Sequence, residues 1–338
     1  MKDLQNYSLL RHNTFGIDAR CQRFMEFDSV GEAQYVARMV CMSALPLLIV
    51  GGGSNLLLTA DFPGLVLHSA IKGCEIVAED GDDVLLRVGS GETWDDFVSH
   101  AVSHGWHGAE NLSLIPGEVG AAAVQNIGAY GVEACDLIER VEAVCISTGE
   151  TVTVAVADCA YGYRQSRFKQ EWKNQFLITH VIFRLSRTFK PRLDYGNICE
   201  ELSRKGIVEP TPQDLRQTII DIRRQKLPDP EVEGNAGSFF MNPIVSREKF
   251  EALLAQYPQM PHYHVDETHE KIPAGWMIDQ CGWKGRALGR AGVHDKQALV
   301  LVNKGGATGA DIVRLSEAIR QDVSERFGVD IHPEVNIV

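Results

Sequence analysis

The segment that most constrains this chain is 114–133, LIPGEVGAAAVQNIGAYGVE. Four glycines and four alanines stand among its twenty residues. Small side chains let a backbone come close to a ligand, and the amides of Gln125 and Asn126 can donate and accept hydrogen bonds at the edge of a neutral ring. The composition fits a backbone that lies along a flat heteroaromatic ring and a phosphate chain. It also fits a plain glycine-rich loop between strands, and this segment alone does not separate the two.

A second glycine-rich segment, GGGSN at 51–55, follows the apolar run 45–50. Successive backbone N–H groups in such a turn can hold a phosphate, whereas a plain hairpin is the structural alternative. The segment is no Rossmann fingerprint, because another apolar extended run, 56–58, stands where that motif would open a helix.

Length and composition set the class of protein. A chain of 338 residues predicts two or three domains. Its 44% hydrophobic and 23% charged residues are ordinary for a globular protein, and its net charge of -12 argues against a general nucleic-acid binder. No apolar run is long enough to span a membrane, and the N-terminus lacks the apolar core of a signal peptide. We therefore expect a cytoplasmic protein with no membrane span.

The eight cysteines are scattered and form no CxxC pair. Spacing of this kind predicts neither a metal site nor a redox centre. In a long chain without an export signal, we expect reduced cysteines in the core or at the surface.

Helix signals recur along the chain. Capping residues predict helix starts at Ser29 with Glu32, at Thr93 with Asp96, at Thr211 before Pro212, and at Thr308 with Asp311. Gly328 ends the last of these helices, and 329–338 is predicted as a final strand. The first two thirds are rich in predicted strands and the last third mixes helices and strands, which indicates an α+β fold.

The segment 161–169, YGYRQSRFK, gathers aromatic and basic residues in an acidic chain. Such a cluster is typical of an anion site. A solvated basic edge is the alternative.

Ten segments together carry a family resemblance. They are NTFGIDA at 13–19, GGGSNLLL at 51–58, ENLSLIPGEVGAAAVQNIGAYGVE at 110–133, YGYRQSRFK at 161–169, LDYGN at 193–197, KLPDP at 226–230, GNAGSFFMNP at 234–243, AGWMIDQCGWKG at 274–285, HDKQALVLVN at 294–303 and HPEV at 332–335. In this order they resemble the UDP-N-acetylenolpyruvoylglucosamine reductase (MurB) family over nearly the whole chain. LDYGN looks like the subtype that folds a tyrosine loop over its substrate.

The resemblance implies a fold. It is an α+β architecture in which an FAD-binding region of the vanillyl-alcohol-oxidase type, made of subdomains 1–70 and 71–213, precedes a C-terminal α+β substrate-binding domain at 214–338. The last strand, about 329–338, would return to the active site.

The resemblance also implies a reaction. NADPH reduces a tightly and non-covalently bound FAD, and the reduced flavin passes a hydride from its N5 atom to the enolpyruvyl double bond of a UDP-sugar. UDP-N-acetylmuramate, a peptidoglycan precursor, is the product. The partners would be small molecules only, and the protein a monomer.

By the same resemblance, three residues would be catalytic. Arg164 would stabilise the enolate with an arginine fork, Glu334 would assist beside the carboxyl group, and Ser238 would donate the proton. The cofactor residues would be Gly51, Gly52, Gly53, Ser54, Asn55, Pro116, Gly117, Gly120, Gln125, Asn126, Gly128, Ala129, Tyr130 and Gly131. The substrate residues would be Tyr163, Tyr195, Arg223, Lys226, Asn242 and Gln297.

Two positions depart from the family pattern. Met241 stands where lysine is common, and Asn336 stands where arginine or a bulky residue is common. Both bear on nucleotide binding, and neither is a catalytic candidate. Two other functions remain open from the sequence: a flavoenzyme of the same fold that oxidises a small alcohol with oxygen, and a nucleotide-sugar binding protein without turnover.

Overall fold

The computed structural model describes residues 1–338 and divides the chain into two compact units. The first unit consists of Met1–Tyr7, Cys21–Gly52 and Pro63–Arg223, and the second of Ser8–Arg20, Gly53–Phe62 and Arg224–Val338. Each unit is therefore built from separate parts of the chain. The domain limits at 70/71 and 213/214 stay predictions.

The first unit contains a small sheet next to helix α1 (Val30–Cys41). Its strands, in order across the sheet, are β1 (Lys2–Ser8), β2 (Arg20–Phe27), β5 (Phe62–Ser69) and β3 (Leu47–Val50). Ala33, Val36 and Ala37 of α1 are buried in one core with Leu65 and Leu67 of β5.

Ser29 caps α1 as predicted, because its side chain accepts a hydrogen bond from the backbone N–H of Glu32. The predicted return bond of a capping box is not formed to Ser29. The Glu32 carboxylate instead accepts from the N–H of Asp28 at 3.0 Å.

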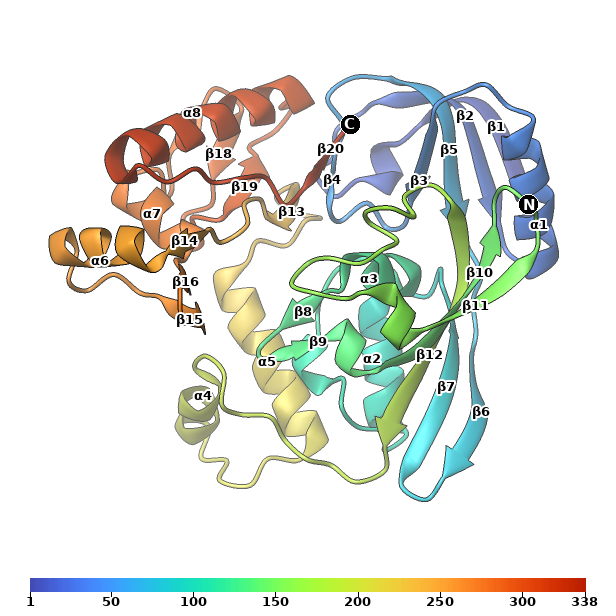
Figure 1. Ribbon diagram of the computed structural model, residues 1–338, viewed down its shortest axis with the longest axis horizontal. Helices are drawn as coiled ribbons and strands as arrows, with labels where there is room; N and C mark the ends of the chain where they lie inside the picture. The colour runs from blue at the N-terminus through green and yellow to red at the C-terminus, as the bar shows by residue number, and fades with distance from the viewer. The chain divides into compact units, whose positions relative to one another are not determined.

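A five-stranded antiparallel sheet forms the larger core of the first unit (Figure 1). Its order is β11 (Thr151–Ala155), β10 (Ile138–Cys145), β12 (Phe176–Ser186), β7 (Asp83–Gly89) and β6 (Cys74–Asp80). Helices α2 (Trp94–Ser103) and α3 (Val119–Gln125) share its buried cluster. Phe97 stacks on Phe183 of β12, with ring centroids 4.7 Å apart.

The helix start predicted at Thr93 is confirmed, because Thr93 is the N-cap residue of α2. The Thr93 side chain makes no capping bond, and the residue instead forms an isolated antiparallel bridge with Glu118. Pairing of the backbone with the segment 114–133 thus takes the place of a local cap.

The segment 114–133 is more structured than a plain loop between strands. It contains α3, whose C-cap Asn126 has a left-handed φ of 46°, and then the short hairpin of β8 (Gly128–Ala129) and β9 (Val132–Glu133). The consecutive alanines favour this helix, and the glycines on either side conceal it in the sequence.

Helices α4 (Ile198–Arg204) and α5 (Pro212–Lys226) pack through Ile198, Leu202, Leu215, Ile219 and Ile222. The prediction of a cap at Thr211 is confirmed, since Thr211 Oγ1 accepts from the N–H of Asp214 and the Asp214 carboxylate accepts from the N–H of Thr211.

The second unit is built on a four-stranded sheet that packs against α8 (Gly309–Phe327), with α7 (Ala274–Gln280) beside that helix. The sheet order is β13 (Asn235–Ser238), β19 (Val300–Asn303), β18 (Ala291–Val293) and β17 (Ala287–Leu288). The predicted signals of α8 are confirmed. Thr308 and Asp311 form a capping box, and Gly328 ends the helix with a φ of 58°.

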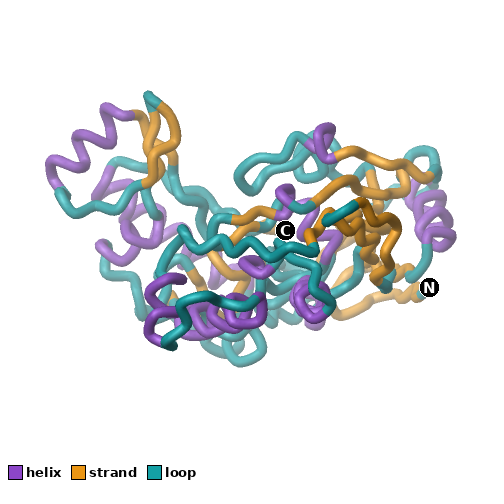
Figure 2. Tube along the Cα trace, turned by 90° about the horizontal axis from the view of Figure 1, so that it is seen from below, coloured by secondary structure: helices purple, strands orange, loops and turns teal.

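A smaller sheet in the second unit lies beside α6 (Arg247–Gln256), as Figure 2 shows at its left edge. Its order is β14 (Ile244–Ser246), β16 (His269–Lys271) and β15 (Tyr263–Asp266). The predicted final strand at 329–338 is much shorter in the structure. Only β20 (Asn336–Ile337) forms a strand, and it pairs in parallel with β4 (Leu56–Leu57).

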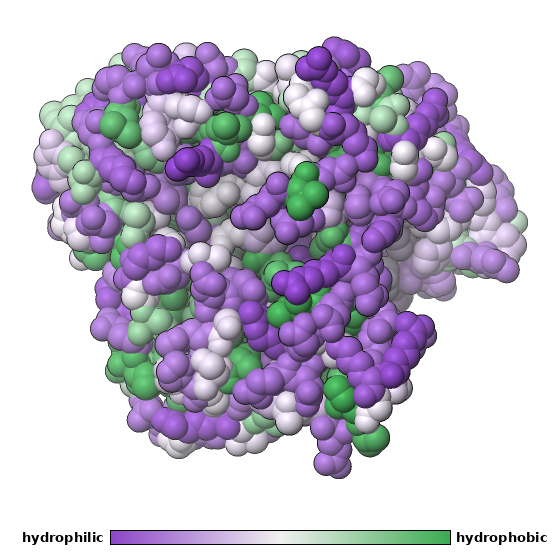
Figure 3. Space-filling model, turned by 180° about the vertical axis from the view of Figure 1, so that it is seen from behind, coloured by the Kyte–Doolittle hydropathy of each residue, from purple (hydrophilic) through white to green (hydrophobic).

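No helix of the protein is both long and apolar enough to cross a membrane. The face drawn in Figure 3 is mainly hydrophilic, with hydrophobic residues in small scattered groups.

Candidate active site

The two glycine-rich segments meet in the first unit, where the end of β3 packs on the start of α3. A Cβ atom added at Gly51 would lie 2.9 Å from the Cβ of Ala121, and one added at Gly52 would lie 3.2 Å from the Cα of Gly117. A side chain at 51 or 52 would therefore press the two segments apart, more strongly at 51 than at 52.

The segment 114–133 presents a partly exposed surface of small residues. Gly117, Gln125, Gly128 and Ala129 are all partly exposed, so a ligand can lie directly against their backbone. Gly117 has a φ of 109°, a conformation that glycine adopts without strain. We name this surface, Gly117, Gln125, Gly128 and Ala129 together with Gly51 and Gly52, the cradle.

Two predicted cofactor residues lie behind the cradle. A Cβ atom at Gly120 would lie 2.8 Å from the Cβ of Ser90. Asn126 is fully buried, where its side-chain amide donates to Glu133 and to the carbonyl oxygen of Gly162 and accepts from the N–H of Cys135. Both residues shape the cradle from beneath.

The segment 161–169 lies against the cradle and carries Arg164 to it. Nη2 of Arg164 donates to the carbonyl oxygen of Gly128 at 2.9 Å, and Nη1 donates to that of Asn126 at 3.5 Å. Ser166 fastens the same segment by donating from Oγ to the carbonyl oxygen of Val124 at 2.6 Å. Arg164 has a left-handed φ of 56°, which is uncommon outside glycine and often found at functional positions.

Two predicted substrate residues lie near the ends of the segment 114–133. The Cβ of Tyr195 would lie 3.3 Å from a Cβ atom added at Gly131, so this tyrosine packs on the turn after β8. Arg223 donates from Nε to the carbonyl oxygen of Leu114 at 3.3 Å. Tyr163, beside Arg164 in the chain, is exposed.

The other two catalytic candidates come together in the second unit. Ser238 ends β13 and pairs with Val300, and its neighbour Phe239 accepts a hydrogen bond at 2.8 Å from the backbone N–H of Glu334. Phe240 and Pro333 form an antiparallel bridge beside it. The segments that carry Ser238 and Glu334 are thus adjacent, although almost one hundred residues of chain separate them.

The rest of the glycine-rich segment 51–55, from Gly53 on, belongs to the second unit and contacts the segment that carries Glu334. The side-chain amide of Asn55 donates to the carbonyl oxygen of Glu334 at 3.4 Å. Gly53 has a φ of 67°, and a Cβ atom there would lie 1.9 Å from the carbonyl oxygen of His12. Only glycine fits at 53.

Two predicted substrate residues in the second unit accept hydrogen bonds from backbone N–H groups. Asn242 accepts from the N–H of Ala274 at 2.9 Å, at the first residue of α7, and Gln297 accepts from the N–H of Leu299 at 3.3 Å. Lys226 stands exposed at the end of α5.

Sequence reasoning missed Glu118 and His68, which pair beside the cradle with 3.0 Å between His68 Nε2 and Glu118 Oε1. One signal was present: Glu118 is a charged residue inside an otherwise small and apolar segment, between Gly117 and Gly120.

Comparison with known proteins finds one family match in the N-terminal part of the chain and another in the C-terminal part. Residues 21–155 match the FAD binding domain family, and residues 229–338 match the C-terminal domain of UDP-N-acetylenolpyruvoylglucosamine reductase. The UDP-N-acetylenolpyruvoylglucosamine reductase of Bacteroides fragilis is 58% identical over 334 residues, which are 99% of each chain. The chain belongs to the UDP-N-acetylenolpyruvoylglucosamine reductase (MurB) family. The MurB protein of Chromobacterium violaceum is 49% identical over 96% of this chain and 95% of its own.

A solved MurB structure has the same fold. The crystal structure of the reductase from Thermus caldophilus superposes with a TM-score of 0.66 at 23% identity, covering 99% of this chain and 98% of that one. The predicted family, the predicted α+β fold with an FAD-binding region and a C-terminal domain, and the predicted FAD cofactor are thereby confirmed. The tyrosine-loop subtype stays a prediction.

Proposed function

We propose that this MurB protein catalyses the NADPH-dependent, FAD-mediated reduction of UDP-N-acetylglucosamine enolpyruvate to UDP-N-acetylmuramate. The step belongs to peptidoglycan synthesis and so serves cell shape and division. The observation that carries the proposal is Arg164, whose guanidinium group is anchored on the carbonyl oxygens of Gly128 and Asn126. A flat small-residue surface with one fixed cation suits an uncharged flavin ring and an anionic substrate beside it.

The cradle fits FAD by its shape and by its donors. Backbone N–H groups at 51–55 would hold the diphosphate, and Pro116, Gly117, Gln125 and the segment 128–131 would lie along the flavin. When bound, FAD accepts a hydride from NADPH and supplies it to the enolpyruvyl double bond. We expect tight, non-covalent binding.

Arg164 would stabilise the charge that develops on the substrate carboxyl group as hydride adds to the terminal carbon. Its guanidinium group can donate two parallel hydrogen bonds to the two oxygens of a carboxylate. Because two carbonyl oxygens already fix the guanidinium group, little reorganisation is needed at the moment of reaction.

Ser238 would donate the proton to the other carbon of the former double bond, and Glu334 would assist at the carboxyl group. A hydroxyl is a weak acid, so this role needs close geometry and a strongly basic enolate. The adjacent backbones of Phe239 and Glu334 support such a joint role.

Six residues would bind the rest of the substrate. Lys226 would serve the diphosphate as a point charge, with Arg223 as a second cation, and Tyr195 would cover the nucleotide sugar. Tyr163, Asn242 and Gln297 would line the pocket. We further propose that 1–70, 71–213 and 214–338 act as two FAD-binding subdomains and a substrate domain, in a cytoplasmic monomer.

Product analysis tests this function. The protein is incubated with NADPH and the enolpyruvyl UDP-sugar, and the nucleotide product is separated and weighed by mass spectrometry. We expect a product heavier than the substrate by one hydride and one proton, formed only when both reactants are present. Oxidation of NADPH that proceeds equally well without the sugar nucleotide would contradict the proposal.

A further inference from the structure

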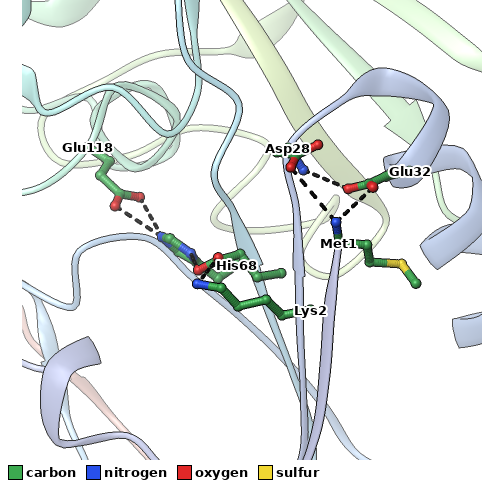
Figure 4. A network of polar contacts seen from close by, with 7 residues as sticks. Met1, Lys2, Asp28, Glu32, His68 and Glu118 are labelled. Atoms are coloured by element: carbon green, nitrogen blue, oxygen red, sulfur yellow. Dashed lines mark hydrogen bonds and ion pairs between the residues drawn. The ribbon is translucent and has the colours of Figure 1, made fainter.

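An ion-pair network runs from beneath the cradle to the protein surface (Figure 4). Glu118, the N-cap residue of α3, contacts Nε2 of His68 at 3.0 Å, and Nδ1 of His68 contacts Glu26 at 2.9 Å. Glu26 pairs in turn with Nζ of Lys2 at 2.6 Å. The four groups alternate in sign along the network when His68 is protonated.

His68 stands directly beside the turn that begins at Gly51. It lies on β5, where it is the register partner of Val50, the last residue of β3. Glu118 is closer still to the turn, because a Cβ atom at Gly51 would lie 3.2 Å from Glu118 Oε2. A carboxylate is therefore held immediately under the two glycines that form the first-unit part of the diphosphate turn.

This placement creates an electrostatic conflict. A diphosphate on the Gly51–Gly52 backbone would be repelled by an unpaired carboxylate beneath it, and burial weakens the screening by water. The Glu118 side chain is only 17% exposed and that of His68 only 10%. The imidazolium of His68 is the charge that removes the conflict.

We propose that His68 is a positioning residue for FAD: as an imidazolium it neutralises Glu118 beneath the Gly51–Gly52 turn and so allows that turn to accept the cofactor's diphosphate. The inference rests on the proposed function, because it takes the diphosphate to lie on this turn. It makes FAD retention depend on a charge that FAD does not touch.

The surroundings of His68 favour its charged form. Burial alone would lower the pKa of His68, but its hydrogen bonds and ion pairs with Glu118 and Glu26 raise it above the ordinary value. Phe24 of β2 also lies against the ring, with ring centroids 6.4 Å apart, and carries no charge. Since the pKa is raised, the imidazolium is present at low pH and is lost as the pH rises through that raised value. FAD retention should weaken in the same direction.

Release of FAD from the holoenzyme tests the proposal without any turnover. The recovery of flavin fluorescence after dilution gives the release rate, measured from about pH 6 to about pH 9 around the histidine range. We expect His68→Gln to release FAD roughly tenfold faster at the lower pH, because Glu118 loses its partner. Glu118→Gln should hold FAD at least as well as the unchanged protein, with a flatter pH dependence.

The double variant His68→Gln with Glu118→Gln separates charge from shape. Removing the carboxylate as well should restore slow release. If the double variant releases FAD as fast as His68→Gln, or if His68→Gln releases it at the unchanged rate, the proposal is overturned. His180→Gln is the matched control, since His180 is buried to the same extent but pairs with Arg87 on the large sheet.

Two outcomes keep the proposal separate from the proposed function. Unchanged protein that binds no FAD contradicts the function itself, whereas normal binding with no effect of the variants contradicts only the role of His68. If His68→Gln does not fold, the pH series of the unchanged protein and of Glu118→Gln decide. Equal pH dependence in these two proteins would then overturn the proposal.

Discussion

Nη2 of Arg164 lies 2.9 Å from the carbonyl oxygen of Gly128. This bond ties the basic segment 161–169 to the glycine- and alanine-rich segment 114–133. The guanidinium group is fixed by the same backbone that would support the flavin.

Arg164→Lys tests the need for a fork. Lysine keeps the charge but cannot hold two carbonyl oxygens and a carboxylate in one plane. We expect kcat to fall about 10²- to 10³-fold, as for the loss of one preorganised donor, while FAD stays bound. Arg167→Lys, on the same segment but paired with Glu171 at the surface, is the control and should keep its rate. A normal rate for Arg164→Lys would refute the role in stabilising the enolate.

Ser238→Ala should separate the two half-reactions. The flavin should still be reduced by NADPH at the normal rate, because no proton donor is needed there. Its reoxidation by the enolpyruvyl UDP-sugar should slow by about 10²- to 10⁴-fold, the usual loss for a general acid. Stopped-flow absorbance follows both phases. Reoxidation at the unchanged rate would exclude Ser238 as the proton donor.

Lys226→Ala should act mainly on binding. Loss of a charged contact to the diphosphate should weaken the affinity for the UDP-sugar roughly tenfold or more, with little change in the rate at saturation. Arg224→Ala removes an exposed cation two residues earlier on α5 and serves as the control. A fall in rate with unchanged affinity would speak against a phosphate contact.

The variants Gly53→Ala and Gly16→Ala compare two glycines that have the same backbone conformation. Gly16 has a φ of 66° and open space around it, whereas a Cβ atom at Gly53 would meet the carbonyl oxygen of His12. Gly16→Ala should therefore cost about 1–2 kcal/mol of stability through strain alone. Gly53→Ala should cost more than about 4 kcal/mol, because a steric clash is added. Chemical denaturation measures both, and equal costs would contradict the described packing of the turn.

Local signals in the sequence predicted the elements that local interactions decide. The caps at Thr211 and Thr308 and the end of α8 at Gly328 depend on residues three or four apart, so the sequence contains the whole cause. Thr93 is the N-cap residue of α2 as predicted, but its side chain makes no capping bond, and its backbone pairs with the distant residue Glu118. Of the strand predicted at 329–338, only Asn336–Ile337 forms, since its partner β4 is equally short.

Some residues of the site could be predicted from the sequence and others could not. Arg164, Ser238 and Glu334 were predicted by family resemblance, because the motifs that carry them are short and continuous, and their roles stay predictions. The pairing of His68 with Glu118 could not be found, because fifty residues separate the two and only the parallel pairing of β3 with β5 brings His68 to the turn. Contacts set by sheet topology leave no periodic trace in the sequence.

The most direct test of the central claim is the visible spectrum of the purified protein under anaerobic conditions, first with NADPH and then with the enolpyruvyl UDP-sugar. We predict a flavin band that bleaches with NADPH and returns when the sugar nucleotide is added. A flavin band that returns only with oxygen would contradict the reductase and favour an oxidase, and no flavin band after FAD is supplied would leave the cradle without its ligand.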